Sequence, residues 1–237
     1  MIRLHNISLG YDGHTLLREA EVRFTAATLT ALVGRNGAGK STLIRAIIGS
    51  EKTISGEIFI DNKPLAELSP AELSKRLAYV GTERIRIANL TCREVVAMGR
   101  MPYTNWFGTL KRADFEIVER SIAAVQMQQF ADRDISTLSD GEAQRIMIAK
   151  ALAQQSDIII LDEPSAFLDI PTRFEICRLL RYLAHDEGKC ILFSTHDTDA
   201  AFEVCDQFAV IDNKQLRVIA KEEAPTEFVK LFGITTK

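Results

Sequence analysis

Apolar residues along this chain fall into two patterns that predict different secondary structure. Unbroken apolar runs at Leu29 to Val33 and Ile158 to Leu161 indicate buried strands, whereas Lys40 to Ile48 has apolar residues at helical spacing. After the second run, a predicted helix over about Thr172 to His185 is followed by an apolar run at Cys190 to Thr195. Strands that alternate with helices in this way predict a parallel sheet.

The N-terminal part of the chain shows a different pattern. Alternating apolar residues at Ile2 and Leu4, and again at Val22 and Phe24, predict antiparallel strands on either side of a turn-like Gly10-Tyr11-Asp12-Gly13. Gly56 to Ile60 predicts a further strand, and Asp206 to Ile219 predicts a hairpin.

Three capping-box sequences mark predicted helix starts in the middle of the chain. They are Ser69-Pro70-Ala71-Glu72, Thr91-Cys92-Arg93-Glu94 and Ser139-Asp140-Gly141-Glu142. The region from about Leu90 to Leu138 is therefore expected to be mostly helical.

Composition narrows the class of protein. The 237 residues are 46% hydrophobic, enough for a buried core in one large or two small domains. A net charge of −3 with mixed signs argues against a nucleic-acid partner. Four cysteines without paired spacing are expected to fill the core of a protein from a reducing compartment. We expect neither a secretory signal nor a bilayer-spanning segment, so any membrane role would need another chain to span the membrane.

The segment from Gly34 to Ser41 fits the phosphate-loop pattern G-x-x-x-x-G-K-[ST] and lies between a predicted strand and a predicted helix. Its glycines let backbone N–H groups turn toward phosphate oxygens, and the helix N-terminus adds its positive dipole end. Lys40 can then reach the terminal phosphates, and the Ser41 hydroxyl can bind Mg²⁺. This motif predicts nucleotide binding.

Two carboxylates, Asp162 and Glu163, follow the apolar strand that ends at Leu161. This is the edge at which parallel sheets hold ligands, so the segment is interpreted as a Walker B strand. Asp162 is placed to hold the Mg²⁺ hydration shell, and Glu163 to polarise an attacking water. The alternative is a strand-end turn with solvated acids.

Leu138-Ser139-Asp140-Gly141-Glu142-Ala143-Gln144-Arg145 resembles the signature sequence of ATP-binding-cassette (ABC) ATPases, which other phosphate-loop proteins lack. Ser165 to Asp169 resembles the D-loop of that family, and Ser194 to Asp197 its switch-histidine segment. Tyr11 resembles its adenine-stacking aromatic residue, although a tyrosine in a turn also serves as a loop anchor. These elements follow the family's order along nearly the whole chain.

The resemblance implies an α/β fold. A single phosphate-loop ABC ATPase domain would occupy 1–237, with an N-terminal antiparallel β subdomain, a RecA-like parallel-sheet core and a helical subdomain over approximately 90–153. It also implies ATP and Mg²⁺ as cofactors. The residues it assigns to ATP binding are Tyr11, Gly34, Arg35, Asn36, Gly37, Ala38, Gly39, Lys40, Ser41 and Thr42.

In ABC proteins two cassettes hold ATP between them, so the resemblance implies a homodimer. The signature residues Ser139, Asp140, Gly141 and Glu142 would contact the γ-phosphate held by the other copy, because a capped helix N-terminus attracts anions. Asp169 would serve in the D-loop. His196, which by itself would more often be an ordinary strand-end histidine, is assigned to the γ-phosphate beside the catalytic Glu163.

The chain departs from the family after the predicted strand Leu77 to Val80. ABC proteins usually carry a glutamine there that binds Mg²⁺, but this sequence has Gly81-Thr82-Glu83. The expected metal ligands are therefore Ser41 and Asp162 with Thr82 or Glu83, and we expect looser Mg²⁺ geometry and slower turnover. Asp140 also replaces the usual signature glycine, and we expect its side chain to point away from phosphate.

The stretch from Glu94 to Tyr103, followed by Trp106-Phe107-Gly108, resembles importers of iron siderophores, haem and cobalamin, although a generic helix end with an aromatic loop would also account for it. The resemblance implies a cytoplasmic ATPase subunit of an ABC importer. It would lie on the inner or plasma membrane through permease subunits and work with a substrate-binding protein. The alternative is a soluble non-transport ABC ATPase, or an ATP-binding regulator with weak turnover.

Overall fold

Two β-sheets organise the structure, which is a computed structural model that describes residues 1–11, 13–82 and 89–233. Within these ranges the smaller sheet has the strand order β2-β1-β4-β5 and is antiparallel. This arrangement confirms the predicted N-terminal strands. The strands of this sheet are β1 (Ile2–Tyr11), β2 (His14–Phe24), β4 (Ser55–Ile60) and β5 (Lys63–Pro64).

The larger sheet has the order β10-β9-β3-β8-β7-β6 among the described residues, and only β10 runs antiparallel to its neighbour. It confirms the predicted parallel core. Because the strands β3, β6, β7 and β8 are parallel, the residues that follow them meet at one edge of the sheet. The strands are β3 (Thr28–Gly34), β6 (Leu77–Val80), β7 (Ile158–Leu161), β8 (Cys190–Ser194), β9 (Gln207–Asp212) and β10 (Gln215–Ala220).

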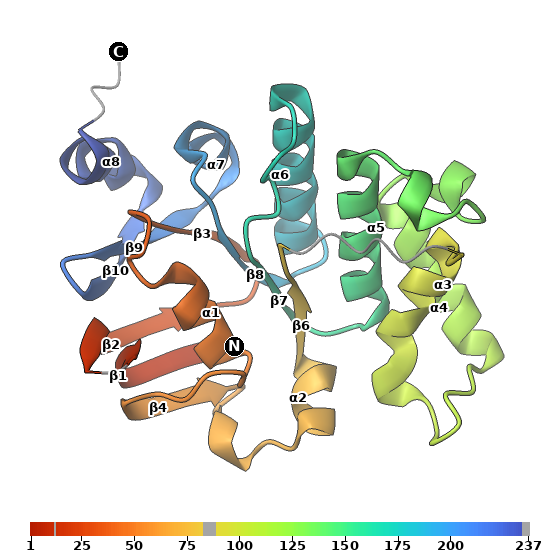
Figure 1. The fold of residues 1–237 in the computed structure, drawn as a ribbon, viewed down its shortest axis with the longest axis horizontal. Helices are drawn as coiled ribbons and strands as arrows, with labels where there is room; N and C mark the ends of the chain where they lie inside the picture. Colours follow the sequence, from red (N-terminus) through yellow and green to blue (C-terminus); the bar gives the residue numbers. More distant parts are fainter. Residues whose placement is uncertain (12, 83–88, 234–237) are drawn as a thin grey trace.

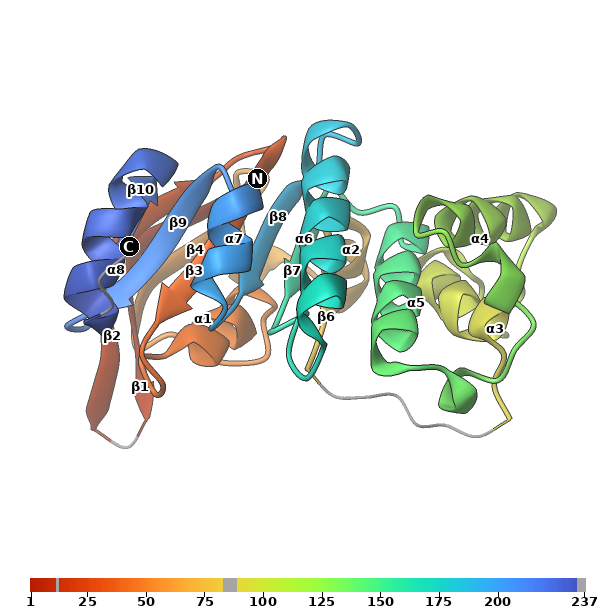
Figure 2. The same cartoon turned by 90° about the horizontal axis from the view of Figure 1, so that it is seen from above.

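Both faces of the larger sheet are buried, which explains why apolar and polar residues do not alternate along its strands. In β7, Ile158 and Ile160 belong to the core cluster shared with α1 and the small sheet, whereas Ile159 and Leu161 belong to the cluster on the opposite face. Helix α1 (Lys40–Ile47) covers the first face, while the second is covered by α6 (Ile170–His185), α7 (Thr198–Val204) and α8 (Ala224–Phe232) (Figures 1 and 2).

A helical lobe lies beside the sheets (Figure 1). It contains α3 (Cys92–Ala97), the 3-10 helix η2 (Met98–Tyr103), α4 (Arg112–Ala124) and α5 (Asp140–Ala153). Gly99 allows close packing inside the lobe, because a Cβ there would lie 2.2 Å from the carbonyl oxygen of Lys150. The short 3-10 helices η3 (Gln128–Phe130) and η4 (Ile135–Thr137) complete the lobe, which confirms the predicted helical region.

All three predicted capping boxes are formed. Ser69 caps α2 (Pro70–Arg76), Thr91 caps α3 and Ser139 caps α5, each paired with the glutamate three residues later. Short-range side-chain bonds of this kind can be recognised in sequence because they need no tertiary contact.

The four cysteines, Cys92, Cys177, Cys190 and Cys205, are buried and free of disulfides, which agrees with the prediction that they fill the core. Among the described residues no helix combines the length and apolar character needed to cross a membrane.

Candidate functional site

The segment between β3 and α1 forms a loop with an open helix N-terminus. Gly37 and Gly39 have φ values of 76° and 104°, in the left-handed region where glycine is strongly favoured. Gly39 is the N-cap of α1 but offers no side chain to the first-turn N–H groups, and that turn contains no acidic residue. The positive end of the helix is therefore available to an anion.

Lys40 lies at the start of α1 with its side chain folded over this loop. Its Nζ donates a hydrogen bond to the carbonyl oxygen of Gly34 at 2.9 Å. Burial lowers the pKa of Lys40, and the nearby carboxylates of Glu163 and Asp162 oppose that shift. The amine is thus held by carbonyl oxygens of the loop, with two carboxylates nearby. It borders a hollow that is also lined by Tyr11, Glu163 and His196, so a phosphate bound in this hollow would lie close to the amine.

Asp162, which directly follows β7, accepts hydrogen bonds from two serine hydroxyl groups on neighbouring segments. Ser194 Oγ donates to Asp162 Oδ1 at 2.6 Å, and Ser41 Oγ donates to the same oxygen at 3.4 Å. A serine hydroxyl beside a carboxylate is a hard oxygen pair of the kind that binds Mg²⁺ together with water and phosphate oxygens. The residues present therefore fit a magnesium ion.

Two residues, Thr82 and Glu83, are the candidates for the third protein ligand. Thr82 follows β6 at the same edge of the sheet and is exposed. Glu83 lies outside the described residues, so its expected role stays a prediction.

Glu163 contacts His196 across the gap between two parallel strands. His196 Nε2 lies 2.5 Å from Glu163 Oε1, and both side chains border the hollow above the loop. Glu163 has a φ of 50°, which is uncommon outside glycine, and its N–H donates to Ser194 Oγ at 2.9 Å. Unusual backbone angles of this kind persist where surrounding contacts hold them and often occur at active sites.

Tyr11 lies at the same hollow but is anchored by its hydroxyl group. The oxygen is 3.0 Å from Thr42 Oγ1 and accepts a hydrogen bond from Arg45 Nη2 at 3.2 Å, and the hydroxyl donates to Glu51 Oε2 at 3.4 Å. The ring borders the hollow together with Asn36 and the loop glycines. Adenine stacking by this ring stays a prediction.

The signature residues line a second hollow, together with residues 167–169 and the start of α6. Ser139 Oγ donates to Glu142 Oε2 at 2.7 Å, and this hydrogen bond lowers the pKa of Glu142. Asp169 caps α6 by accepting from the Thr172 N–H at 2.9 Å. Gly141 allows the two helix starts to approach, since a Cβ there would lie 2.5 Å from Thr172 Cγ2. Asp140 lines this hollow as well.

The two hollows share no lining residue. One chain therefore brings the phosphate loop, Glu163, His196 and Tyr11 together, but it holds the signature and Asp169 in a separate group.

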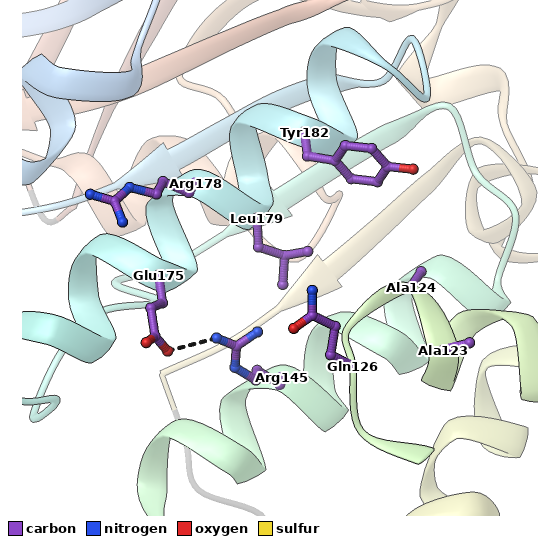
Figure 3. Close-up of a pocket in the computed structure, with 8 residues that line it drawn as sticks. All are labelled: Ala123, Ala124, Gln126, Arg145, Glu175, Arg178, Leu179 and Tyr182. Atoms are coloured by element: carbon purple, nitrogen blue, oxygen red, sulfur yellow. Dashed lines mark hydrogen bonds and ion pairs between the residues drawn. The ribbon is translucent and has the colours of Figure 1, made fainter.

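A cavity of about 620 Å³ separates the helical lobe from α6 (Figure 3). Arg145 of α5 crosses its edge and pairs with Glu175 of α6 at 2.8 Å. This ion pair was not predicted, because its partners are 30 residues apart in the chain. Ser194 was likewise missed as a site residue, although a hydroxyl at a strand end next to Asp162 was a usable signal.

Comparison with known proteins identifies relatives along most of the chain. Residues 17–166 match the family described as ABC transporter. An uncharacterized ABC transporter ATP-binding protein of Methanocaldococcus jannaschii is 37% identical over 216 residues, which cover 91% of this chain and 74% of that protein. A probable siderophore transport system ATP-binding protein of Bacillus subtilis is 33% identical, with coverages of 94% and 81%. A dimeric bacterial ABC transporter cassette has a TM-score of 0.78 at 26% identity, with coverages of 93% and 99%.

Proposed function

This chain belongs to the ABC transporter family of ATP-hydrolysing cassettes, and we propose that it powers import of an iron chelate, haem or cobalamin-type cargo through a separate membrane permease. The observation that carries the proposal is the meeting of Lys40, the Ser41–Asp162 pair and the Glu163–His196 pair at one sheet edge. The siderophore transport relative supports the class of cargo.

Hydrolysis would proceed in the hollow above the loop. The loop N–H groups and Lys40 would bind the phosphates, and Ser41 and Asp162 would hold Mg²⁺, whose positive charge would offset negative charge on the phosphate oxygens. Glu163 orients a water molecule and accepts its proton. His196 donates a hydrogen bond toward the γ-phosphate from beside Glu163.

A homodimer would complete this site. The signature hollow lies apart from the phosphate loop within one chain, so a second copy is needed to bring Ser139 to the nucleotide. Phe167 and Ile170, on either side of Asp169, are 77% and 66% exposed, which favours a contact surface there. The similar bacterial cassette, which is dimeric, supports a homodimer.

We further propose that 1–237 forms one ABC domain, with a helical subdomain over approximately 90–153. It would lie at the cytoplasmic face of the membrane, bound to its permease, with a substrate-binding protein in the complete system and no nucleic-acid partner.

Two measurements test the proposal. The purified chain is expected to release phosphate from ATP only with Mg²⁺ present, and an integral permease is expected to co-purify with it from native membranes. Phosphate release by the purified chain, combined with the failure of any integral permease to co-purify from native membranes, would favour the soluble non-transport ATPase. ATP binding without phosphate release, even with the permease supplied, would favour the regulator.

A further inference from the structure

The turn that joins η2 to α4 presents large apolar side chains to solvent. Trp106 is 97% exposed, Phe107 is 88% exposed and Met101, within η2, is 66% exposed. Single exposed apolar residues are ordinary, but adjacent aromatic residues exposed to this degree indicate a surface that contacts something else. The turn projects from the lower end of the helical lobe in Figure 1.

Local hydrogen bonds hold this turn in shape. The side-chain oxygen of Asn105, Oδ1, accepts hydrogen bonds from the N–H groups of Phe107 and Thr109, both at 3.1 Å. The backbone carbonyl oxygen of Asn105 accepts one from the Gly108 N–H at 2.9 Å. Gly108 has a φ of 68°, which closes the turn. Trp106 and Phe107 are therefore presented by an ordered backbone.

The charge beside these aromatic residues is positive. Lys111 and Arg112 are exposed, whereas Asp114, the only acidic residue of 101–115, is buried and pairs with Arg100 at 2.9 Å. Glu116 lies 3.6 Å from Arg112 in an exposed ion pair, which contributes little. A chain with a net charge of −3 thus carries a local cationic patch next to its most exposed aromatic residues.

We propose that this turn, residues 101–112, binds the anionic phospholipid surface of a bilayer directly. Trp106 and Phe107 enter the interfacial region, where aromatic rings are favoured, and Lys111 and Arg112 bind the anionic headgroups. A lipid surface fits better than a protein pocket because Trp106 and Phe107 are almost fully exposed and the charged residues of 101–112, Lys111 and Arg112, are both positive. This contact goes beyond the proposed function, since it needs neither the permease nor ATP.

Trp106 is the only tryptophan of the chain, so intrinsic fluorescence reports on this turn alone. The full chain is mixed with vesicles of phosphatidylcholine alone or with added phosphatidylglycerol. The emission is expected to shift to shorter wavelength with the anionic vesicles, to shift less with phosphatidylcholine alone, and to be quenched by brominated acyl chains. Emission that stays unshifted with anionic vesicles at low salt overturns the proposal.

Vesicle co-sedimentation measures the contribution of each side chain. Lys111→Gln and Arg112→Gln are each expected to lower the partition coefficient roughly fivefold. Trp106→Ala is expected to lower it by roughly tenfold. The matched control Arg181→Gln/Lys214→Gln removes two exposed cations elsewhere and is expected to leave binding unchanged.

An equal loss of vesicle binding in the Arg181→Gln/Lys214→Gln control would mean that binding depends on net charge alone, and this result would overturn the proposal. A shift of Trp106 emission only with a permease in the bilayer, and never with lipid, would mean that the turn contacts protein instead. ATP hydrolysis by the soluble chain is expected to be the same in all of these variants. A failure here therefore leaves the proposed ATPase function untouched.

Discussion

His196 Nε2 lies 2.5 Å from Glu163 Oε1, so the side chains that follow β7 and β8 meet above the phosphate loop. These two strands are adjacent and parallel, which brings residues 33 positions apart in sequence to one edge of the sheet. The pair defines where water and the terminal phosphate must meet if the chain hydrolyses ATP as proposed.

Replacing Glu163 tests the assigned base. Glu163→Gln keeps the shape and a hydrogen-bonding oxygen for His196, but it cannot accept a proton from water. Turnover is expected to fall by about 10²–10⁴-fold while ATP affinity is retained. Phosphate release and equilibrium nucleotide binding measure the two quantities, and near-parental hydrolysis would contradict the role.

Ser194 is expected to control the metal site through Asp162. Ser194→Ala removes the donor at 2.6 Å from Asp162 Oδ1 and the acceptor for the Glu163 N–H. The Mg²⁺ concentration for half-maximal hydrolysis is expected to rise roughly 10–100-fold, as when a partner of a metal ligand is lost. Ser136→Ala, which removes a hydroxyl of the helical lobe, is the control, and an unchanged Mg²⁺ requirement in Ser194→Ala would exclude the role.

The departure from the family at Gly81-Thr82-Glu83 predicts a slow enzyme. Thr82→Gln restores the longer oxygen ligand and is expected to raise turnover, whereas Glu83→Ala is expected to increase the Mg²⁺ requirement. ATPase rates over a range of Mg²⁺ concentrations measure both effects. If neither substitution changes the rate or the metal dependence, the idea fails.

The ion pair between Arg145 and Glu175 is expected to set the position of the signature helix. Arg145 is mostly buried and Glu175 half-exposed, so Glu175→Gln is expected to lower turnover only about two- to fivefold at unchanged ATP affinity. Exchanging the charges, Arg145→Glu with Glu175→Arg, is expected to recover part of the loss. Glu203→Gln is the control, because it removes the ion-pair partner of Arg178, which lies on α6 like Glu175. An equal loss of turnover in Glu203→Gln would mean that the Arg145–Glu175 pair has no particular role in positioning the signature helix.

Stability is expected to depend on pH through the capping boxes. Hydrogen bonds from the Ser69 N–H, Lys63 and the Ser69 hydroxyl lower the pKa of Glu72 from 4.5 to about 2. Because the folded-state pKa is below the unfolded value, this stabilisation is complete above pH 4.5 and is lost as the pH falls toward 2. The melting temperature of Glu72→Gln is therefore expected to approach that of the parent as the pH falls through this range; a constant difference would refute the linkage.

Local features of the site were readable from the sequence because their contacts lie within a few residues. The phosphate loop, the acidic strand end and the capping residues Ser69, Thr91 and Ser139 each depend on neighbouring backbone groups. The strands also followed from their apolar runs, since burial on both faces of a parallel sheet requires them.

The order of residues along the chain specifies which of them can bind a nucleotide and which segments are strands or helices, because backbone preference and short-range hydrogen bonds act between near neighbours. Which of those residues meet depends on how the strands and helices pack in three dimensions. The order of parallel strands brought Glu163 to His196 and Ser194 to Asp162, and it kept the signature apart from the phosphate loop. The exposure of Trp106 likewise follows only from the fold, because the sequence does not show whether a tryptophan is buried or exposed.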